Sequence, residues 1–493
     1  MVTFNEAGLN GELQNYIDGQ WQSATSEDRR SIDNPASGET LIHLRDSTPS
    51  DVDEAVNAAV DAQRAWRDQP IESRVQVLFE LKNKLEGNRD ELAELLSRDQ
   101  GKTLAEAEGE MHRAIQNVEH ACGAPSLMQT PSLANAASEI DEREIRHPLG
   151  VFAAITPFNF PVFVSLWYLP YAIVTGNAIL LKPSDLTPLA VQRMFELIDT
   201  LSLPDGLVQL VHGDRETVTA ILEHDDIAGV SFVGSTPVAE HIYETAAAHG
   251  KRVQAQGGAK NNVVVTESAD LPFAAEKVVG GAYTCMGERC LATDTAIVVD
   301  EVYDEFVDLV VDEVDEITIG PGTDPTTDMG PVITQEHKRT IENYIETGIE
   351  EGATLVRDGR DFVTEPDSDG HFIGPTVFGD VAVGTRLGTE EIFGPVLCIT
   401  RVSDLEEAIS VTNRSEFGNA ACLYTSDGGE ARRFRKDVDA GNIGVNVGTA
   451  APLSYFHMGG RKDSFFGDLH AQGRDIIDFY TDRKTYIEHW PNE

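Results

Sequence analysis

Residues 151–185 read VFAAITPFNFPVFVSLWYLPYAIVTGNAILLKPSD, and their pattern indicates the fold class. A short β-rich run, VFAAI, is followed by a longer apolar run and then by a second β-rich run, NAILLKP. The alternation continues up to Gly234 through LAVQRMFELIDTL, GLVQLVHG, ETVTAILEH and IAGVSFVG. Strands that alternate with longer helices predict a mostly parallel sheet covered on both faces, with ligands at the carboxyl ends of the strands.

Beyond this block the sequence predicts a second α/β region. From about Lys260 to Gly460 the chain has strand patterns of its own (TAIVVD, ATLVRDG, PVLCITRV, NIGVNV) and two long helical patterns. Upstream, apolar residues recur at three- and four-residue spacing from Asp51 to Trp66 and from Ile71 to Cys122, which indicates helices. The tail IIDFYTDRKTYIEHW alternates like a strand and is expected to pair with a neighbouring segment or subunit. Two α/β domains are therefore expected.

The composition is that of an ordinary globular protein. With 493 residues the chain exceeds the size of one hydrophobic core, and 41 % hydrophobic with 25 % charged residues argues against disorder. The first thirty residues lack a signal pattern, and the longest apolar run is interrupted by Pro161, Ser165 and Pro170, so no membrane span is expected. Five scattered cysteines do not resemble a disulfide framework. We expect a cytoplasmic protein.

The charge balance is extreme. The chain has 83 acidic and 38 basic residues, a formal net charge of −45. This disfavours nucleic acid as a partner. Because the acidic residues are dispersed over helical stretches, we interpret them as the solvated surface of a halophilic protein.

Cys290, in MGERCLA, is the candidate nucleophile. A buried structural thiol is the commonest role of a free cysteine. Gly287 and Arg289 favour a different role, because a turn near a cation is expected to expose the sulfur and lower its pKa. A metal site with Cys285 is disfavoured, since no second Cys or His pair stands at ligand spacing, and no metal is expected.

Several ordered blocks resemble the aldehyde dehydrogenase superfamily over nearly the whole chain: residues 155–185, SFVGSTPVAEHI, QGGAKNN, MGERCLA, EEIFGPV and GNIGVNV. Within it, GKTLAEAEGEMHRAIQNVEHAC, HGKRVQAQGGAKNN and FFGD are most similar to the CoA-acylating methylmalonate-semialdehyde dehydrogenases. The resemblance implies an α/β fold with three parts. These are a Rossmann-type NAD-binding domain (1–125 and 149–258), an α/β catalytic domain (259–460) and a small β oligomerisation element (126–148 and 476–493) of a homodimer or homotetramer.

The resemblance also implies the roles of individual residues. Cys290 would attack the aldehyde, and Asn159 together with the Cys290 N–H would hold the oxyanion. Glu391 and Phe393 would grip the nicotinamide ribose and ring. The remaining NAD-binding positions are Phe158, Lys182, Asp185, Gly234 and Ser235, of which Ser235 would face the pyrophosphate at a helix amino terminus. Asp185 would accept the ribose hydroxyls and favour NAD over NADP.

One departure from the family pattern concerns the release of product. Gln256 stands where most aldehyde dehydrogenases carry the Glu that activates water, and Tyr168 follows Trp167 where the family has a lysine. A glutamine cannot accept a proton, so the thioester needs a nucleophile that is already good at neutral pH. Coenzyme A is the expected co-substrate.

Two arginines are expected to bind a substrate carboxylate. In the acylating family the positions of Arg113 and Arg289 are taken to hold it, and forked guanidinium donors suit that geometry. For Arg113 the alternative is a surface cation in i,i+4 pairs.

The resemblance therefore implies NAD-dependent oxidation of a 3-oxo-carboxylate such as methylmalonate or malonate semialdehyde to an acyl-CoA, with loss of carbon dioxide. A hydrolytic semialdehyde dehydrogenase for another carboxylated aldehyde is the first alternative. A non-catalytic member of the fold is the second, and the intact Cys290, Asn159, Lys182 and Glu391 argue against it.

Overall fold

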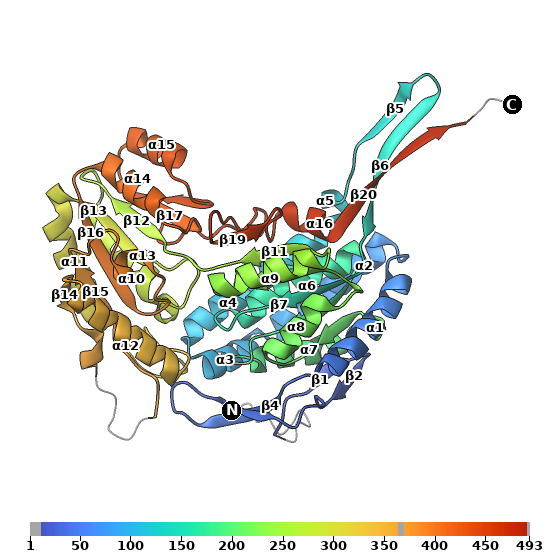
Figure 1. Ribbon diagram of the computed structural model, residues 1–493, viewed down its shortest axis with the longest axis horizontal. Helices are drawn as coiled ribbons and strands as arrows, with labels where there is room; N and C mark the ends of the chain where they lie inside the picture. Colours follow the sequence, from blue (N-terminus) through green and yellow to red (C-terminus); the bar gives the residue numbers. More distant parts are fainter. Residues whose placement is uncertain (1–10, 363–368, 491–493) are drawn as a thin grey trace.

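A computed structural model describes residues 11–362 and 369–490 of the chain. Two large sheets, each with its own helices, form the body, and a narrow three-stranded arm extends from it (Figure 1). The predicted domain ranges also include residues 1–10, 363–368 and 491–493, which lie outside the described residues.

The first sheet has eight strands, and its five central strands are parallel. In spatial order the strands are β19 (Phe465–Gly467), β11 (Arg252–Gln256), β10 (Ile227–Val233), β7 (Val151–Ile155), β8 (Ala178–Lys182), β9 (Val208–Leu210), β1 (Asn15–Ile17) and β2 (Gln20–Gln22). The edge strand β19 pairs antiparallel with β11, and at the other side β1 pairs antiparallel with β9 and with the edge strand β2. The block that begins at Val151 therefore forms the centre of a doubly wound sheet.

Helices cover both faces of this sheet. One face carries α1 (Pro49–Trp66), α8 (Arg215–Glu223) and α9 (Thr236–Ala248). The other carries α6 (Pro161–Thr175) and α7 (Leu189–Asp199), with α2 (Ile71–Gly87), α3 (Arg89–Gln100), α4 (Leu104–Cys122) and the short α5 (Ala124–Leu127) packed outside them.

The predicted helical stretch from Ile71 to Cys122 folds as three separate helices, α2, α3 and α4. One break is at Asn88 and the other at Gly101, which has a left-handed backbone with φ 96°. A Cβ at Gly101 would lie 2.9 Å from the Pro331 carbonyl oxygen, so the close approach of the two backbones requires glycine there.

The second sheet has seven strands, parallel except for the β14 edge. Its order is β14 (Thr354–Arg357), β15 (Thr376–Gly379), β16 (Val396–Val402), β13 (Thr295–Val299), β12 (Asn262–Val265), β17 (Ala420–Tyr424) and β18 (Asn442–Val445). The helices around it are α10 (Leu271–Tyr283), α11 (Tyr303–Asp315), α12 (Gln335–Glu350), α13 (Arg386–Thr389), α14 (Leu405–Arg414) and α15 (Gly428–Asp437). Short 3-10 turns η2 (Thr284–Gly287), η3 (Asp300–Val302) and η4 (Gly359–Asp361) complete it.

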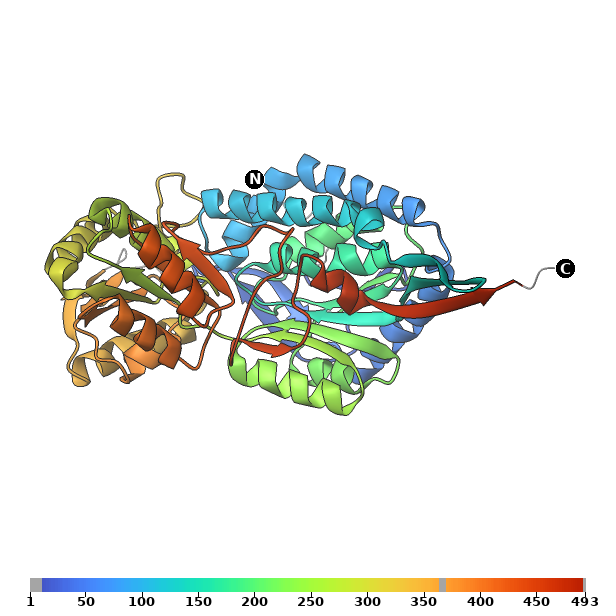
Figure 2. The ribbon, with the colours of Figure 1, turned by 90° about the horizontal axis from the view of Figure 1, so that it is seen from above.

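The arm consists of β5 (Ser132–Ala137), β6 (Ile140–Pro148) and β20 (Thr481–His489), and it points away from the body in both views (Figures 1 and 2). Strand β20 pairs with β6 along its full length. Apolar side chains on the arm are exposed: Leu133 by 61 %, Ile487 by 66 % and Trp490, just beyond β20, by 79 %. The arm therefore presents apolar surface that its own chain leaves uncovered.

The prediction of one strand over the tail is wrong for its first part. Asp475–Tyr480 forms a helix, α16, before β20 begins. Phe479 and Tyr480 pack on Phe152 of β7, with ring centroids 5.4 and 4.6 Å away. Burial of consecutive apolar residues against the sheet overrides their alternation in the sequence.

A separate hairpin of β3 (Arg29–Asp33) and β4 (Thr40–Arg45) lies beside the first sheet. Among the helices of the described residues, none is long and apolar enough to cross a membrane.

Candidate active site

A cavity of about 550 Å³ opens at the carboxyl ends of β7, β8, β10 and β11, where the doubly wound pattern predicts a ligand. Nine of the predicted site residues line it: Phe158, Asn159, Lys182, Asp185, Gly234, Ser235, Cys290, Glu391 and Phe393. They come from both α/β regions. The structure therefore brings the predicted nucleophile, oxyanion donor and cofactor positions into one space.

The backbone before Cys290 is turned by three consecutive left-handed residues, Cys285 (φ 51°), Met286 (φ 56°) and Gly287 (φ 71°). Each left-handed non-glycine residue costs roughly 1 to 2 kcal/mol, so packing must hold this turn. The carbonyl of Cys290 accepts two hydrogen bonds, from the side-chain amides of Asn261 (3.0 Å) and Asn419 (2.6 Å). The nucleophile is therefore fixed on both sides.

The net effect of the surroundings on the thiol is opposite to the sequence-based prediction. Burial, with a further contribution from Glu391, raises the pKa of Cys290 to about 11, although Arg289 lowers it. The prediction of a lowered pKa is wrong because the loss of water around the sulfur outweighs the single nearby cation. The surroundings therefore favour the thiol form of Cys290 in the protein alone.

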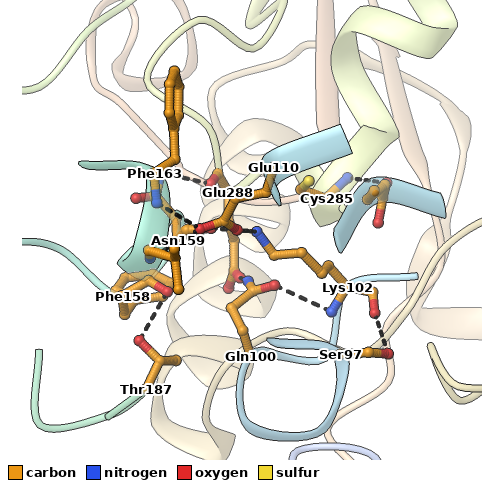
Figure 3. A network of polar contacts seen from close by, with 12 residues as sticks. Ser97, Gln100, Lys102, Glu110, Phe158, Asn159, Phe163, Thr187, Cys285 and Glu288 are labelled. Carbon is orange, nitrogen blue, oxygen red and sulfur yellow. Dashed lines mark hydrogen bonds and ion pairs between the residues drawn. The ribbon is translucent and has the colours of Figure 1, made fainter. Parts of the chain in front are cut away.

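Asn159 is nearly fully buried, and hydrogen bonds hold both its side chain and its backbone (Figure 3). Its side-chain nitrogen donates to the backbone carbonyl of Glu288 at 2.9 Å, and its backbone carbonyl accepts from Lys102 Nζ at 2.6 Å. An amide nitrogen has two hydrogens. One is used by Glu288, which orients the second for a ligand in the cavity.

A buried ion pair supports this segment. Lys102 Nζ lies 2.7 Å from Glu110 Oε2, and both side chains are fully buried. The other oxygen of Glu110 accepts the N–H groups of Val162 (3.0 Å) and Phe163 (3.1 Å) in the first turn of α6. The pair therefore joins α4 to the chain that carries Asn159. Sequence reasoning did not single out either residue, because burial of two charges leaves no local pattern.

Glu288 is a third buried charged group that sequence reasoning missed. Its carboxylate accepts from the N–H of Ile333 at 3.0 Å and from Gln100 Nε2 at 3.1 Å. Burial raises the pKa of Glu288 to about 8. Its backbone carbonyl orients Asn159, so the side-chain contacts of Glu288 fix the loop just before Cys290.

The residues at the predicted cofactor positions fit a dinucleotide. Ser235 is the N-cap of α9, whose amino terminus faces the cavity and suits an anionic group. A Cβ at Gly258 would lie 2.4 Å from Glu391 Oε2, so a larger residue there would displace that carboxylate. Glu391 accepts from the Ala259 N–H at 2.9 Å, and burial raises the pKa of Glu391 to about 8. The Phe158 and Phe393 rings meet edge to face at 5.9 Å.

Lys182 and Asp185 lie at the other end of the cavity. Burial lowers the pKa of the Lys182 ammonium below its ordinary value. Although burial opposes it, Lys182 and Arg30 hold the pKa of Asp185 below its ordinary value. Asp185 is ion-paired with Arg30, a contact that the sequence did not predict.

Gln256 ends β11, next to Gly257 of the cavity wall, and is 9 % exposed. Within the described residues its Nε2 has no hydrogen-bond partner. Tyr168, at the position of the family's lysine, is fully buried. Neither side chain supplies a base.

The two predicted carboxylate-binding arginines do not line this cavity. Arg113 is half-buried: it donates to the carbonyl of Pro452 and lies 5.8 Å from the ring of Phe163. Its hydrogen-bond partner on its own helix, Gln116 at 3.4 Å, is uncharged, unlike the i,i+4 ion pair of the alternative interpretation. Arg289 donates to the Gly281 carbonyl at 2.7 Å, and its buried Nε has no partner within the described part of the chain.

Comparisons with known proteins agree with this architecture. The sequence profile of the aldehyde dehydrogenase family matches residues 21–486. A malonate-semialdehyde dehydrogenase of Halalkalibacterium halodurans is 47 % identical over 480 residues, 97 % of this chain and 98 % of the relative. A crystal structure of methylmalonate-semialdehyde dehydrogenase from Oceanimonas doudoroffii superposes with a TM-score of 0.96 at 40 % identity, covering 98 % and 99 % of the two chains. Betaine aldehyde dehydrogenase from Staphylococcus aureus in complex with NAD+ gives 0.94 at 29 % identity, covering 98 % and 96 %.

Proposed function

This chain belongs to the aldehyde dehydrogenase family, and we propose that it oxidises malonate or methylmalonate semialdehyde with NAD and passes the acyl group to coenzyme A. The observation that carries the proposal is the shared cavity of Cys290, Asn159 and Glu391, beside a glutamine where a water-activating carboxylate would be expected. The names of the most similar relatives support the choice of substrate.

In the first half-reaction, Cys290 releases its proton to solvent and adds as thiolate to the aldehyde carbon, so that a C–S bond forms as the carbonyl π bond breaks. The carbonyl oxygen becomes an alkoxide, which accepts hydrogen bonds from the free N–H of the Asn159 amide and from the Cys290 N–H. Preorganised donors of this kind are commonly worth about 3 to 4 kcal/mol each. Bound NAD supplies the acceptor for the hydride, whose departure from the carbon leaves a thioester on Cys290.

In the second half-reaction, the thiolate of coenzyme A adds to the thioester carbon and Cys290 leaves. Gln256 cannot take a proton from water, which supports a thiol as the acceptor. The β-carboxylate of the acyl group is lost as carbon dioxide, because the thioester carbonyl delocalises the electron pair left on the α-carbon. A proton then replaces the carboxylate. The products are acetyl-CoA from malonate semialdehyde and propionyl-CoA from methylmalonate semialdehyde.

Arg113 and Arg289 are the proposed ligands of the substrate carboxylate. Both guanidinium groups have more N–H donors than their described bonds use, since Arg113 donates to the Pro452 carbonyl and to Gln116 Oε1, and Arg289 donates to the Gly281 carbonyl. For Arg289, the buried Nε without a partner supports an additional acceptor. Burial lowers the pKa of Arg113 below its ordinary value, and an anionic ligand would offset that loss of solvation.

We extend the proposal to the whole protein. The exposed apolar arm supports its role as the oligomerisation element of a dimer or tetramer, with 1–125 and 149–258 as NAD-binding domain and 259–460 as catalytic domain. The five free cysteines support a reducing cytoplasm, and the net charge of −45 supports a halophilic surface.

The test is a transient measurement of NADH absorbance with malonate semialdehyde, with and without coenzyme A. We expect one equivalent of NADH per active site without it and continuous turnover, with acetyl-CoA as product, when it is present. Gln256→Glu should gain slow release of acid without coenzyme A. Rapid multiple turnover of the unmodified protein without any thiol would show the hydrolytic alternative instead.

Cys290→Ala is the control for chemistry. It removes the nucleophile but none of the proposed ribose and phosphate contacts, so NADH formation should stop while NAD binding persists. Retained turnover would refute the assignment of Cys290 and with it the covalent route.

A further inference from the structure

Arg30, on the β3–β4 hairpin, lies behind the wall of the cavity at the Lys182 end. One guanidinium nitrogen donates to Asp185 Oδ2, and the other terminal nitrogen donates to Asp46 Oδ1. The Arg30 side chain is 38 % exposed, while its Nε is buried without a partner among the described residues. Arg30 is therefore a cation held by carboxylates at the edge of a ligand site, with donor capacity to spare.

The charges at this end of the cavity balance because of Arg30. Lys182, Asp185, Asp214 and Arg215 line the wall. Arg30 and Asp46 stand behind it. Without Arg30 this group of side chains would have one more negative than positive charge, and Asp185 would have no guanidinium partner. Arg30 thus determines how strongly this part of the cavity wall repels an approaching anion.

We propose that Arg30 is a specificity-determining residue for the cofactor: it limits the repulsion between Asp185 and a ribose 2′-phosphate, and it binds that phosphate when the Asp185 carboxylate is absent. The inference rests on the proposed function and on the family resemblance, which implies that Lys182 and Asp185 hold the adenosine ribose of NAD. A carboxylate in a dinucleotide site selects the ribose 2′-hydroxyl, and a nearby arginine accommodates a 2′-phosphate. Here one residue of each kind is present, and each is bound to the other.

The ion pair also determines how Asp185 meets a ribose. Arg30 occupies one carboxylate oxygen and leaves the second for the ribose hydroxyls. When position 185 has no charge, the guanidinium nitrogen that bound Asp185 is released, and its N–H groups can donate to a phosphate oxygen. Discrimination against NADP therefore depends on the pair and not on Asp185 alone.

The experiment is isothermal titration calorimetry with two adenosine fragments, AMP and 2′,5′-ADP, which differ by the 2′-phosphate and need no catalysis. The variants are Arg30→Gln, Asp185→Ser and the double variant. Arg29→Gln is the matched control, because Arg29 neighbours Arg30 on β3 but pairs with Glu12 at 3.5 Å. NADP and NAD titrations with the same variants extend the comparison to the whole cofactors.

We expect Asp185→Ser to tighten 2′,5′-ADP relative to AMP by about tenfold to a hundredfold, the range of one hydrogen bond between charged groups. The gain should disappear in the double variant. Arg30→Gln alone should weaken 2′,5′-ADP relative to AMP, and Arg29→Gln should leave the ratio unchanged.

Two results would overturn the inference. One is an equal gain in Asp185→Ser and in the double variant, and the other is an unchanged ratio in Arg30→Gln. If either occurs while the unmodified protein still binds NAD, the proposed cofactor site stands and only the role of Arg30 falls. If the unmodified protein binds neither AMP nor NAD, the proposed cofactor site fails and the inference fails with it.

Discussion

Loss of the Glu110 carboxylate should destabilise the protein through the charge that it leaves behind. In Glu110→Leu, Lys102 stays fully buried with the Asn159 carbonyl as its remaining described hydrogen-bond partner, and the N–H groups of Val162 and Phe163 lose their acceptor. Breaking a buried ion pair costs about 3 to 5 kcal/mol. For a domain of about 250 residues this corresponds to a fall in Tm of about 6 to 20 °C.

Differential scanning calorimetry measures this effect, and a double variant tests its cause. In Lys102→Met with Glu110→Leu no unpaired charge remains, so the fall in Tm should be smaller than the sum of the two single changes. Glu86→Leu is the matched control: the Lys82–Glu86 contact is also 2.7 Å long but exposed, and such pairs are worth about 0 to 1 kcal/mol. Its Tm should barely change.

The same variants should also affect catalysis. Because Lys102 holds the carbonyl of Asn159, kcat should fall in both single variants, while the KM for NAD should change little. The reasoning is refuted if the double variant loses as much stability as the two single variants together, since the Lys102–Glu110 charges would then be uncoupled.

Three further predictions concern reactivity, salt and substrate. Burial raises the pKa of Cys290 to about 11, so its alkylation by iodoacetamide should accelerate about tenfold per pH unit from pH 7 to 10 as the thiolate forms. A rate that levels off below pH 9, or faster labelling of Arg289→Gln, would contradict this. Tm should rise from low to molar salt, because the electrostatic screening length falls from about 10 Å at 0.1 M to about 3 Å at 1 M and the surface carboxylates then repel one another less. A flat or falling Tm would refute the halophilic interpretation. Arg113→Leu should lower kcat/KM for malonate semialdehyde by a factor equivalent to about 2 to 5 kcal/mol. The loss should be far smaller for propionaldehyde, which has no carboxylate. Equal losses for the two aldehydes would show that Arg113 has only a structural role.

The parts of the fold that local pattern specifies could be predicted from the sequence. The alternation after Val151 predicts the parallel centre of the first sheet, because strands and crossover helices have different periods. The Asp475–Tyr480 helix was missed because its apolar residues suit either element until Phe152 is known to lie beneath them. Tertiary packing decides such short segments.

The candidate site shows the same division. Lys182, Glu391 and Cys290 could be proposed from the sequence because each lies in a distinctive block, and the three line one cavity. Lys102, Glu110, Glu288 and Arg30 could not, because their roles depend on partners that are distant along the chain: Asp185 is 155 positions from Arg30, and Gln100 is 188 positions from Glu288. The direction in which the pKa of Cys290 shifts could not be predicted from the sequence either, because burial of the sulfur is a property of the assembled fold.

The first sheet takes its edge strands from both ends of the chain, and this has a consequence for biosynthesis. Strands β1 and β2 are made first, but β19 pairs with Gln256 only after residue 465 has been synthesised, and α16 covers Phe152 later still. Throughout translation of the entire second sheet, the β11 edge and the Phe152 face therefore lack their native cover. A ribosome-bound chain would expose an unpaired strand edge and an apolar face in this interval, the kind of surface that chaperones recognise.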